Sequence, residues 1–147
     1  MGATANLSSE MEVLNAGMDS VVIRHYVAGI IGGRTLDVSN YNLPVIKAGH
    51  VVIRDPSTDT YKPMPVKSSG DGYDSLPGSH EYVGVVVCTK PTSEPLVGIM
   101  YSGEVNDLAS PYPIDDIKAA MKTALPTLVF LHDECRKEVK NERITIY

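Results

Sequence analysis

The chain has 147 residues, enough for one domain, and its hydrophobic content of 43% is typical of a globular protein. No apolar stretch approaches the roughly 18 residues that a membrane-spanning helix needs, so we expect no membrane span. The formal net charge is −5 and the basic residues form no cluster along the chain, which argues against direct nucleic-acid binding.

The first part of the chain differs in character from the rest. Residues 1 to about 19 are predicted to form an arm, in which Gly17 limits the apolar run Met11-Glu12-Val13-Leu14 to a short helical turn. The β-branched and aromatic run Val21 to Ala28 predicts a strand. We therefore divide the chain into an N-terminal arm with an extended strand, residues 1–44, and a β-rich domain, residues 45–147.

Short apolar runs separated by turns characterise the second part. Asp55 to Asp59 is a turn because proline presets φ and the Asp and Ser side chains bond the local backbone. One amphipathic helix is predicted from Pro113 to Ala124, with Asp115 and Asp116 at the positive end of its dipole. Strands are predicted at residues 45–54, 61–66, 83–89, 96–105, 127–131 and 143–147. The predicted fold is mainly β with one helix, a small β-barrel or β-clip-like module carrying an extended N-terminal arm.

The reactive side chains form no recognisable catalytic set. His50 lies within an apolar strand and is most simply a hydrogen-bonded structural residue. The run His132-Asp133-Glu134-Cys135 holds four potential metal ligands, but adjacent residues do not point at one ion. Cys88 is expected to be a reduced core residue. We therefore predict no catalytic, cofactor-binding or metal-binding residues, and no enzyme activity.

The ordered set of runs from residue 45 to 131 resembles a known family. Its elements are Ala48 to Ile53, Tyr61-Lys62-Pro63, Tyr82 to Val87, and Val97 to Val105 with the turn Gly103-Glu104-Val105 and then Leu108. Together with the helix near Ala119-Ala120, this order is similar to the head decoration proteins of tailed phages, the lambda-type decoration protein D family. The chain departs from that family in its long lead before the module and in its extension from 132 to 147.

The resemblance implies a structural role on a bacteriophage head. An auxiliary capsid protein of this kind would be made in the host cytoplasm and would lie on the outer surface of the virion. It would bridge neighbouring major capsid proteins and stabilise the expanded head, as a homotrimer at three-fold or quasi-three-fold positions. The residues expected to contact the capsid are apolar side chains of the arm and its strand: Leu7, Met11, Val13, Leu14, Val22, Ile23 and Tyr26.

Two other interpretations remain open. The same strands could build a small β-barrel ligand-binding or enzymatic domain, with a pocket formed by His50, His80, Asp71 and Glu104. The protein could also be a phage tail or fibre adaptor, since such adaptors are also small β modules.

Overall fold

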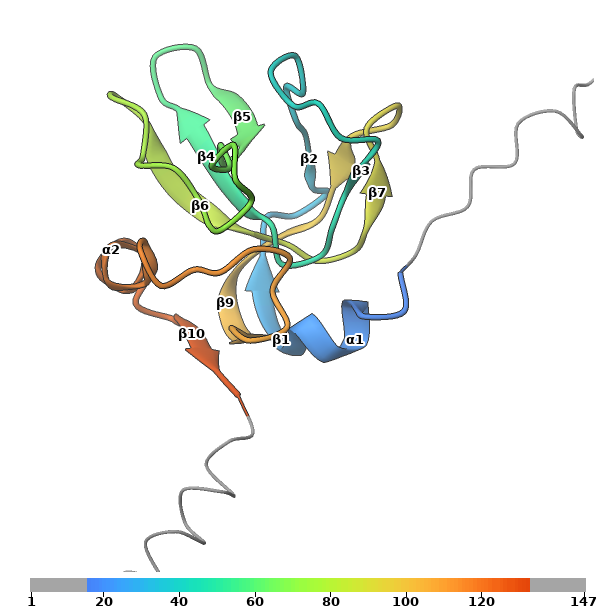
Figure 1. The fold of residues 1–147 in the computed structure, drawn as a ribbon, viewed down its shortest axis with the longest axis vertical. Coiled ribbons are helices and arrows are strands. Elements are labelled where there is room, and N and C mark those ends of the chain that lie inside the picture. Colours follow the sequence, from blue (N-terminus) through green and yellow to red (C-terminus); the bar gives the residue numbers. More distant parts are fainter. Residues whose placement is uncertain (1–15, 133–147) are drawn as a thin grey trace, which may run out of the picture.

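The computed structural model of the chain describes residues 16–132 and contains twelve helices and strands within that range (Figure 1). They are α1 (Asp19–Val22), β1 (Ile23–Gly29), β2 (Arg34–Thr35), β3 (Val45–Ile46), β4 (Val51–Asp55), β5 (Thr60–Pro63), β6 (Glu81–Val86), β7 (Lys90–Pro91), β8 (Leu96–Val97), β9 (Ile99–Asn106), α2 (Lys118–Ala124) and β10 (Leu128–Leu131). The fold is mainly β with little helix, as the sequence predicts, and the four-residue helix α1 is an addition to the predicted set.

The main sheet has the strand order β1-β9-β6-β4-β5, and β10 pairs with β9 as a sixth strand. Two small antiparallel sheets extend pairs of the main sheet. The pair β2 with β8 extends β1 with β9, and the pair β3 with β7 extends β4 with β6. The chain therefore forms two long bent ribbons, one from β1 and β2 against β8 and β9, the other from β3 and β4 against β6 and β7. The short pairing of β6 with β9, at Val85 with Met100 and Val86 with Ile99, joins the two ribbons.

Both faces of the central strands are buried, because apolar side chains alternate between two clusters. Val51, Ile53 and Val85 point into a larger cluster that also contains Met121 of α2 and Leu128 of β10. Their chain neighbours point into a smaller cluster on the opposite face, which contains Ile46, Val52, Val86, Val97 and Ile99. A strand buried on both sides reads as a continuous apolar run, which is why these strands are recognisable in the sequence.

The second half of β9 pairs with β1 on one side and with β10 on the other. Ile23 of β1 lies opposite Val105 in an antiparallel pair, and Phe130 of β10 lies opposite the same Val105 in a parallel pair. Strand β1 starts, and strand β10 stops, at the Val105 end of β9. The described chain thus begins and ends at one end of the sheet, in the lower half of Figure 1.

Most predicted elements differ from the structure in their bounds: the strand predicted at 61–66 ends at Pro63, the one at 83–89 ends at Val86, and the one at 96–105 is divided between β8 and β9. Two further differences have a clear physical reason. The predicted strand 45–54 is interrupted between β3 and β4, because Gly49 adopts φ +88° at the bend and a Cβ there would lie 2.4 Å from Val22 Cγ1. The predicted helix from Pro113 begins only at Lys118, after a turn closed by the Ile117 N–H donating to the Ile114 carbonyl. Asp115 and Asp116 therefore precede α2 instead of lying in its first turn, and Asp116 pairs with Lys67.

Two further expectations are corrected. Cys88 was predicted in the core but is exposed, since the chain leaves β6 at Val86 and bends toward β7. The strand assigned to the N-terminal arm is β1, and it pairs with β9 as an edge strand of the main sheet, so it belongs to the domain itself. The predicted terminal strand 143–147 lies outside the described residues.

Candidate functional site

The residues predicted to contact a partner fall into three groups. Val22 is buried at 3% exposure and packs in the larger core cluster, with the partly buried Ile23 against it. Tyr26 is 51% exposed on β1 and remains available at the surface. The other predicted contact residues, Leu7, Met11, Val13 and Leu14, lie outside the described range. The structure therefore moves Val22 and Ile23 from the predicted contact set into the packing of the domain.

Strand β1 lies at one edge of the main sheet. Its neighbour on one side is β9, and no strand in the described range pairs with its other side. The strand is seven residues long, contains no proline, and exposes Tyr26 and Val27. The register of β1 against β9 shifts at three places along the strand, so the edge is irregular, and Tyr26 and Val27 are the exposed apolar side chains that a strand from another chain would meet there.

A second exposed apolar surface lies at the end of the sheet where the described chain begins and ends. Met18 and Val21 of the α1 region are 52% and 43% exposed, and Leu108, just after β9, is 63% exposed. We call these three residues the end surface. Sequence reasoning used Leu108 only as part of a motif and did not single out Met18 or Val21, because nothing local in the sequence shows that they flank the same strand end.

Asp19 anchors the N-terminal side of the end surface. The Thr89 backbone N–H and hydroxyl donate to the two carboxylate oxygens of Asp19 at 2.8 and 2.6 Å. The Ala48 N–H in turn donates to the Thr89 hydroxyl oxygen at 3.1 Å. This network ties α1 to the bend between β3 and β4 and to the start of β7, so the position of Met18 and Val21 is fixed.

Asp107 anchors the C-terminal side. Its carboxylate accepts hydrogen bonds from His132 Nδ1 at 2.7 Å and from Lys118 Nζ at 2.8 Å. Burial acts to raise the pKa of Asp107, but the hydrogen bonds from Lys118 and His132 outweigh it and the pKa is lowered. His132 was considered above as part of a run of potential metal ligands. In the structure it binds Asp107, while residues 133–135 lie outside the described range.

His50 lies in the interior between three tyrosine rings. Its ring stands edge-on to Tyr41, Tyr73 and Tyr112, with centroids 5.3 to 5.7 Å apart. Nε2 lies 3.0 Å from the Met64 carbonyl oxygen and therefore carries the proton, while Nδ1 is buried and has no hydrogen-bond partner. Burial lowers the pKa of His50 to about 4. His50 is the hydrogen-bonded structural histidine that the sequence predicts.

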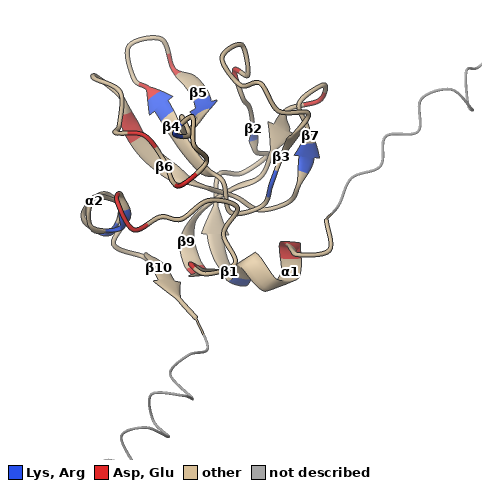
Figure 2. Ribbon diagram, in the orientation of Figure 1, with Lys and Arg blue, Asp and Glu red and all other residues tan. Residues whose placement is uncertain are grey.

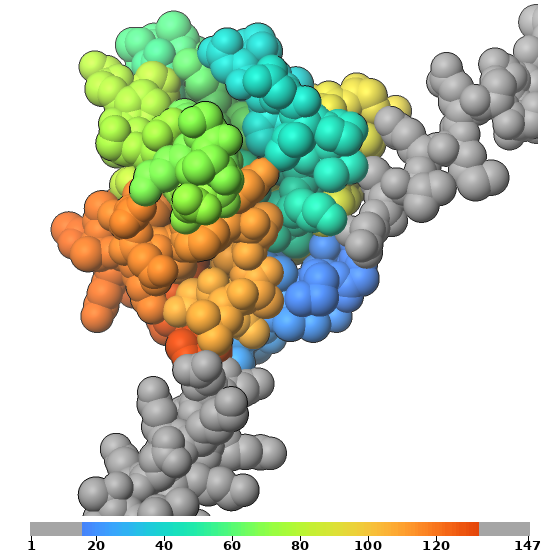
Figure 3. Space-filling model, in the orientation of Figure 1, coloured from blue at the N-terminus to red at the C-terminus, as the bar shows by residue number. Residues whose placement is uncertain are grey.

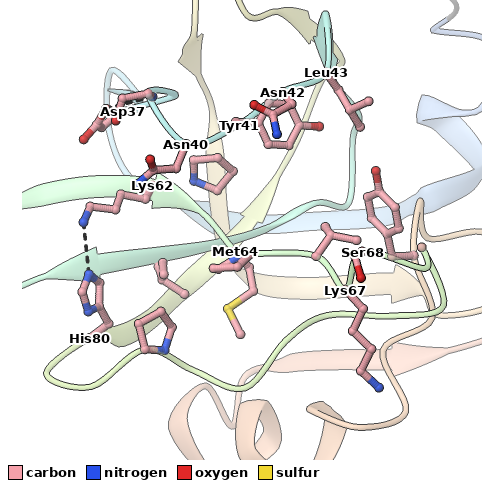
Figure 4. Close-up of a pocket in the computed structure, with 18 of the residues that line it drawn as sticks. Asp37, Asn40, Tyr41, Asn42, Leu43, Lys62, Met64, Lys67, Ser68 and His80 are labelled. Atoms are coloured by element: carbon pink, nitrogen blue, oxygen red, sulfur yellow. Dashed lines mark hydrogen bonds between the residues drawn. The ribbon is translucent and has the colours of Figure 1, made fainter.

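The hollow beside Lys62 and His80 does not bring together the four residues of the alternative pocket hypothesis. Its volume is about 620 Å³, and of His50, His80, Asp71 and Glu104 only His80 lines it (Figure 4). His80 Nδ1 donates to the Gly78 carbonyl, which leaves Nε2 to accept from Lys62 Nζ at 3.3 Å. Glu104 instead lies on β9 opposite His25, and its carboxylate is 4.0 Å from Arg24 Nε.

The charged side chains and the potential metal ligands of residues 16–132 do not gather at one place. Lys and Arg are spread over β1, β2, β4, β5, β7 and α2 and over the loops between them, in separate positions (Figure 2). Within that range no three His, Cys, Asp or Glu side chains come together as a metal-binding group. Neither described helix has the length and apolar character needed to cross a bilayer.

Comparisons of the chain with protein families, with curated proteins and with solved structures find no match.

Proposed function

We propose that this chain is a structural virion protein, a decoration protein that binds the outer surface of the assembled phage capsid and bridges neighbouring major capsid subunits. The observation that carries the proposal is the placement of both ends of the described chain at one end of the sheet, beside the exposed Met18, Val21 and Leu108. One end of the domain therefore combines an apolar surface with both connections to the terminal segments. The sequence resemblance described above supports the same role.

The free edge of β1 gives this role a second contact. A strand of a coat subunit could add to the outer side of β1, where backbone hydrogen bonds would provide affinity and Tyr26 and Val27 would provide side-chain contacts. The buried Val22 and the partly buried Ile23 hold β1 in place before any partner binds, so no ordering of this strand opposes the pairing.

Stabilisation of the head follows from linkage. A protein that contacts several coat subunits at once binds only their assembled arrangement, and therefore favours that arrangement. A homotrimer on a three-fold position would present three equal end surfaces, and each bound copy would raise the local concentration of the others. Weak single contacts can in this way give firm attachment.

Cosedimentation tests the proposal. The full-length protein is mixed with expanded heads of its phage and, separately, with unassembled coat protein. We expect it to sediment with the heads and to show no binding to free subunits. The double variant Met18→Asp and Leu108→Asp should bind heads at least about tenfold more weakly, because both changes place charge on a surface that is to be desolvated.

The matched control changes an exposed apolar residue at the other end of β1. Ile31 is 95% exposed in the turn between β1 and β2, so Ile31→Asp should leave head binding unchanged. The proposal would be contradicted if the protein bound free coat subunits as tightly as expanded heads. It would also be contradicted if Ile31→Asp weakened head binding as much as the double variant does.

One observation favours the ligand-binding alternative. The 620 Å³ hollow lies within the size range of small-molecule sites, roughly 300–1,000 Å³, and contains the Lys62–His80 pair. A screen of anionic ligands by thermal shift, repeated on Lys62→Ala, tests it: a shift that Lys62→Ala abolishes would support this alternative. A tail or fibre adaptor would instead be present in far fewer copies than the coat protein.

A further inference from the structure

A second hollow adjoins the one beside Lys62 and His80, on the face where the loops before β3, after β5 and after β9 meet (Figure 3). Its volume is about 450 Å³, and its walls are mainly apolar: Met18 just before α1 and Val22 at the end of α1, Leu43 and Pro44 from the loop before β3, and Ala109 and Pro111 from the loop after β9. Tyr41, Leu43 and Tyr112 line both hollows. Together they form one groove, with an apolar half next to Met18 and a more polar half at Lys62 and His80.

We infer that the apolar half of this groove is the docking site, in the free protein, for residues 10–14 of the same chain. The position of the groove is the first argument. Met18 is part of its wall, and Leu14 precedes Met18 by only four residues, so a chain with a reach of about 3.4 Å per residue brings Leu14 onto the groove. A segment attached this closely has a high effective concentration at the site.

The order of side chains in the segment is the second argument. Val13 and Leu14 are the residues nearest to Met18, and they are apolar like the half of the groove that contains Met18. The acidic Glu10 and Glu12 come earlier in the chain and would extend toward the polar half. In the polar half Lys67 is paired with Asp116, so Lys62, which contacts His80, is the lysine that Glu10 and Glu12 would approach; residues 1–15 contain no Lys or Arg.

This inference concerns the free protein and does not depend on capsid binding. If both hold, the apolar residues of the segment are covered in solution and leave the groove when they find a coat subunit. The segment would then choose between two sites, and docking would compete with attachment.

A spin-label experiment on the full-length chain tests the inference. Cys88→Ser and Cys135→Ser remove the native thiols, and Ser9→Cys carries a nitroxide. We expect the nitroxide to broaden the amide signals of Leu43, Ala48 and Ala109, so that they lose most of their intensity. The amide signal of the distant Ile31 should keep its full intensity. The unchanged shift of the core residue Met100 confirms that the labelled protein is folded.

Two variants in this labelled background separate docking from chance proximity. The double change Val13→Asp and Leu14→Asp should restore the groove signals, because charged side chains do not enter an apolar hollow. Leu7→Asp is the matched control and should leave the broadening in place. Broadening that survives Val13→Asp and Leu14→Asp, or no broadening at all, would overturn the inference.

A mixing experiment identifies the copy that supplies the segment. Isotope-labelled protein without the nitroxide is mixed with nitroxide-labelled protein of natural isotope content. Docking within one chain predicts no broadening in this mixture. Broadening of the groove signals there would show that a second copy occupies the groove and would overturn docking within the chain.

Discussion

Thr89 donates two hydrogen bonds to the carboxylate of Asp19, one from its backbone N–H and one from its hydroxyl. Seventy residues separate the two along the chain. The pair joins the short helix α1 to the bend that precedes β7, and Ala48 adds a third hydrogen bond to the same network. Residues from Asp19 onward are therefore part of the folded domain, and the surface formed by Met18 and Val21 has a fixed place on it.

Removing the Asp19 carboxylate should destabilise the domain. Asp19→Ala leaves the buried Thr89 without its acceptors, and an unsatisfied group of this kind costs about 1–3 kcal/mol in the free energy of unfolding. Urea unfolding of the two proteins measures the difference. Asp115→Ala, at an exposed position before α2, is the control and should change the unfolding free energy by less than about 0.5 kcal/mol. If the two changes lowered the free energy of unfolding equally, the hydrogen bonds between Asp19 and Thr89 would contribute nothing measurable to stability.

The free energy of unfolding should decrease as the pH is lowered from about 6.5 to about 4, before most carboxylates of the domain take up protons. Burial lowers the pKa of His50 from 6.5 to about 4 in the folded state, so between these values the unfolded chain binds more protons than the folded one. The stability that neutral His50 provides is fully present above pH 6.5 and is lost as the pH falls to about 4. At about 1.36 kcal/mol per pKa unit the loss is roughly 3 kcal/mol.

Asp107 acts in a separate, lower pH window. Its pKa is lowered in the folded state, so its contribution is present above the pKa of the unfolded chain and is lost only as the pH falls through the lower folded value. Urea unfolding at several pH values between 7 and 4 distinguishes the two groups. In the variant His50→Gln the unfolding free energy should change much less with pH in this range. If it changed as much as in the unmodified protein, groups other than His50 would cause the pH dependence.

The pairing of β1 with β9 depends on the absence of a side chain at Gly103. Its φ is +149°, and a Cβ at this position would lie 2.3 Å from the His25 carbonyl oxygen. Gly103→Ala should therefore separate the two strands and lower the unfolding free energy by about 2 kcal/mol or more. Gly78→Ala is the matched control, because a Cβ there meets no atom within 4 Å. Thermal unfolding of both variants measures the effect, and a stable Gly103→Ala protein would show that the strands can adjust.

The strands that the sequence reveals best are those buried on both faces. The apolar runs predicted as strands at 45–54, 83–89 and 96–105 overlap β4, β6 and β9, where Val51 and Val52, Val85 and Val86, and Ile99 and Met100 send neighbouring side chains into opposite core clusters. The break between β3 and β4 is not visible in the same way. It depends on the positive φ of Gly49 and on the close approach of Val22, which only the folded chain brings there.

The end surface was beyond sequence reasoning for a related reason. Met18 and Leu108 are far apart in the chain and lie at the same end of the sheet only because β1 starts opposite the end of β9. Parallel pairing of β10 with β9 has no local sequence signal. Tyr26 could be selected as an exposed contact residue from the sequence, whereas the burial of Val22 follows from the packing of α1 on the larger core cluster.

The proposed function requires the protein to attach in many copies to an assembled shell. Quantitative mass spectrometry of purified virions tests it most directly, by comparing the molar amount of this chain with that of the major capsid protein. We predict amounts of the same order, as expected for a protein bound at every three-fold and quasi-three-fold position. Absence from the particles, or only a few copies for each shell, would contradict the account.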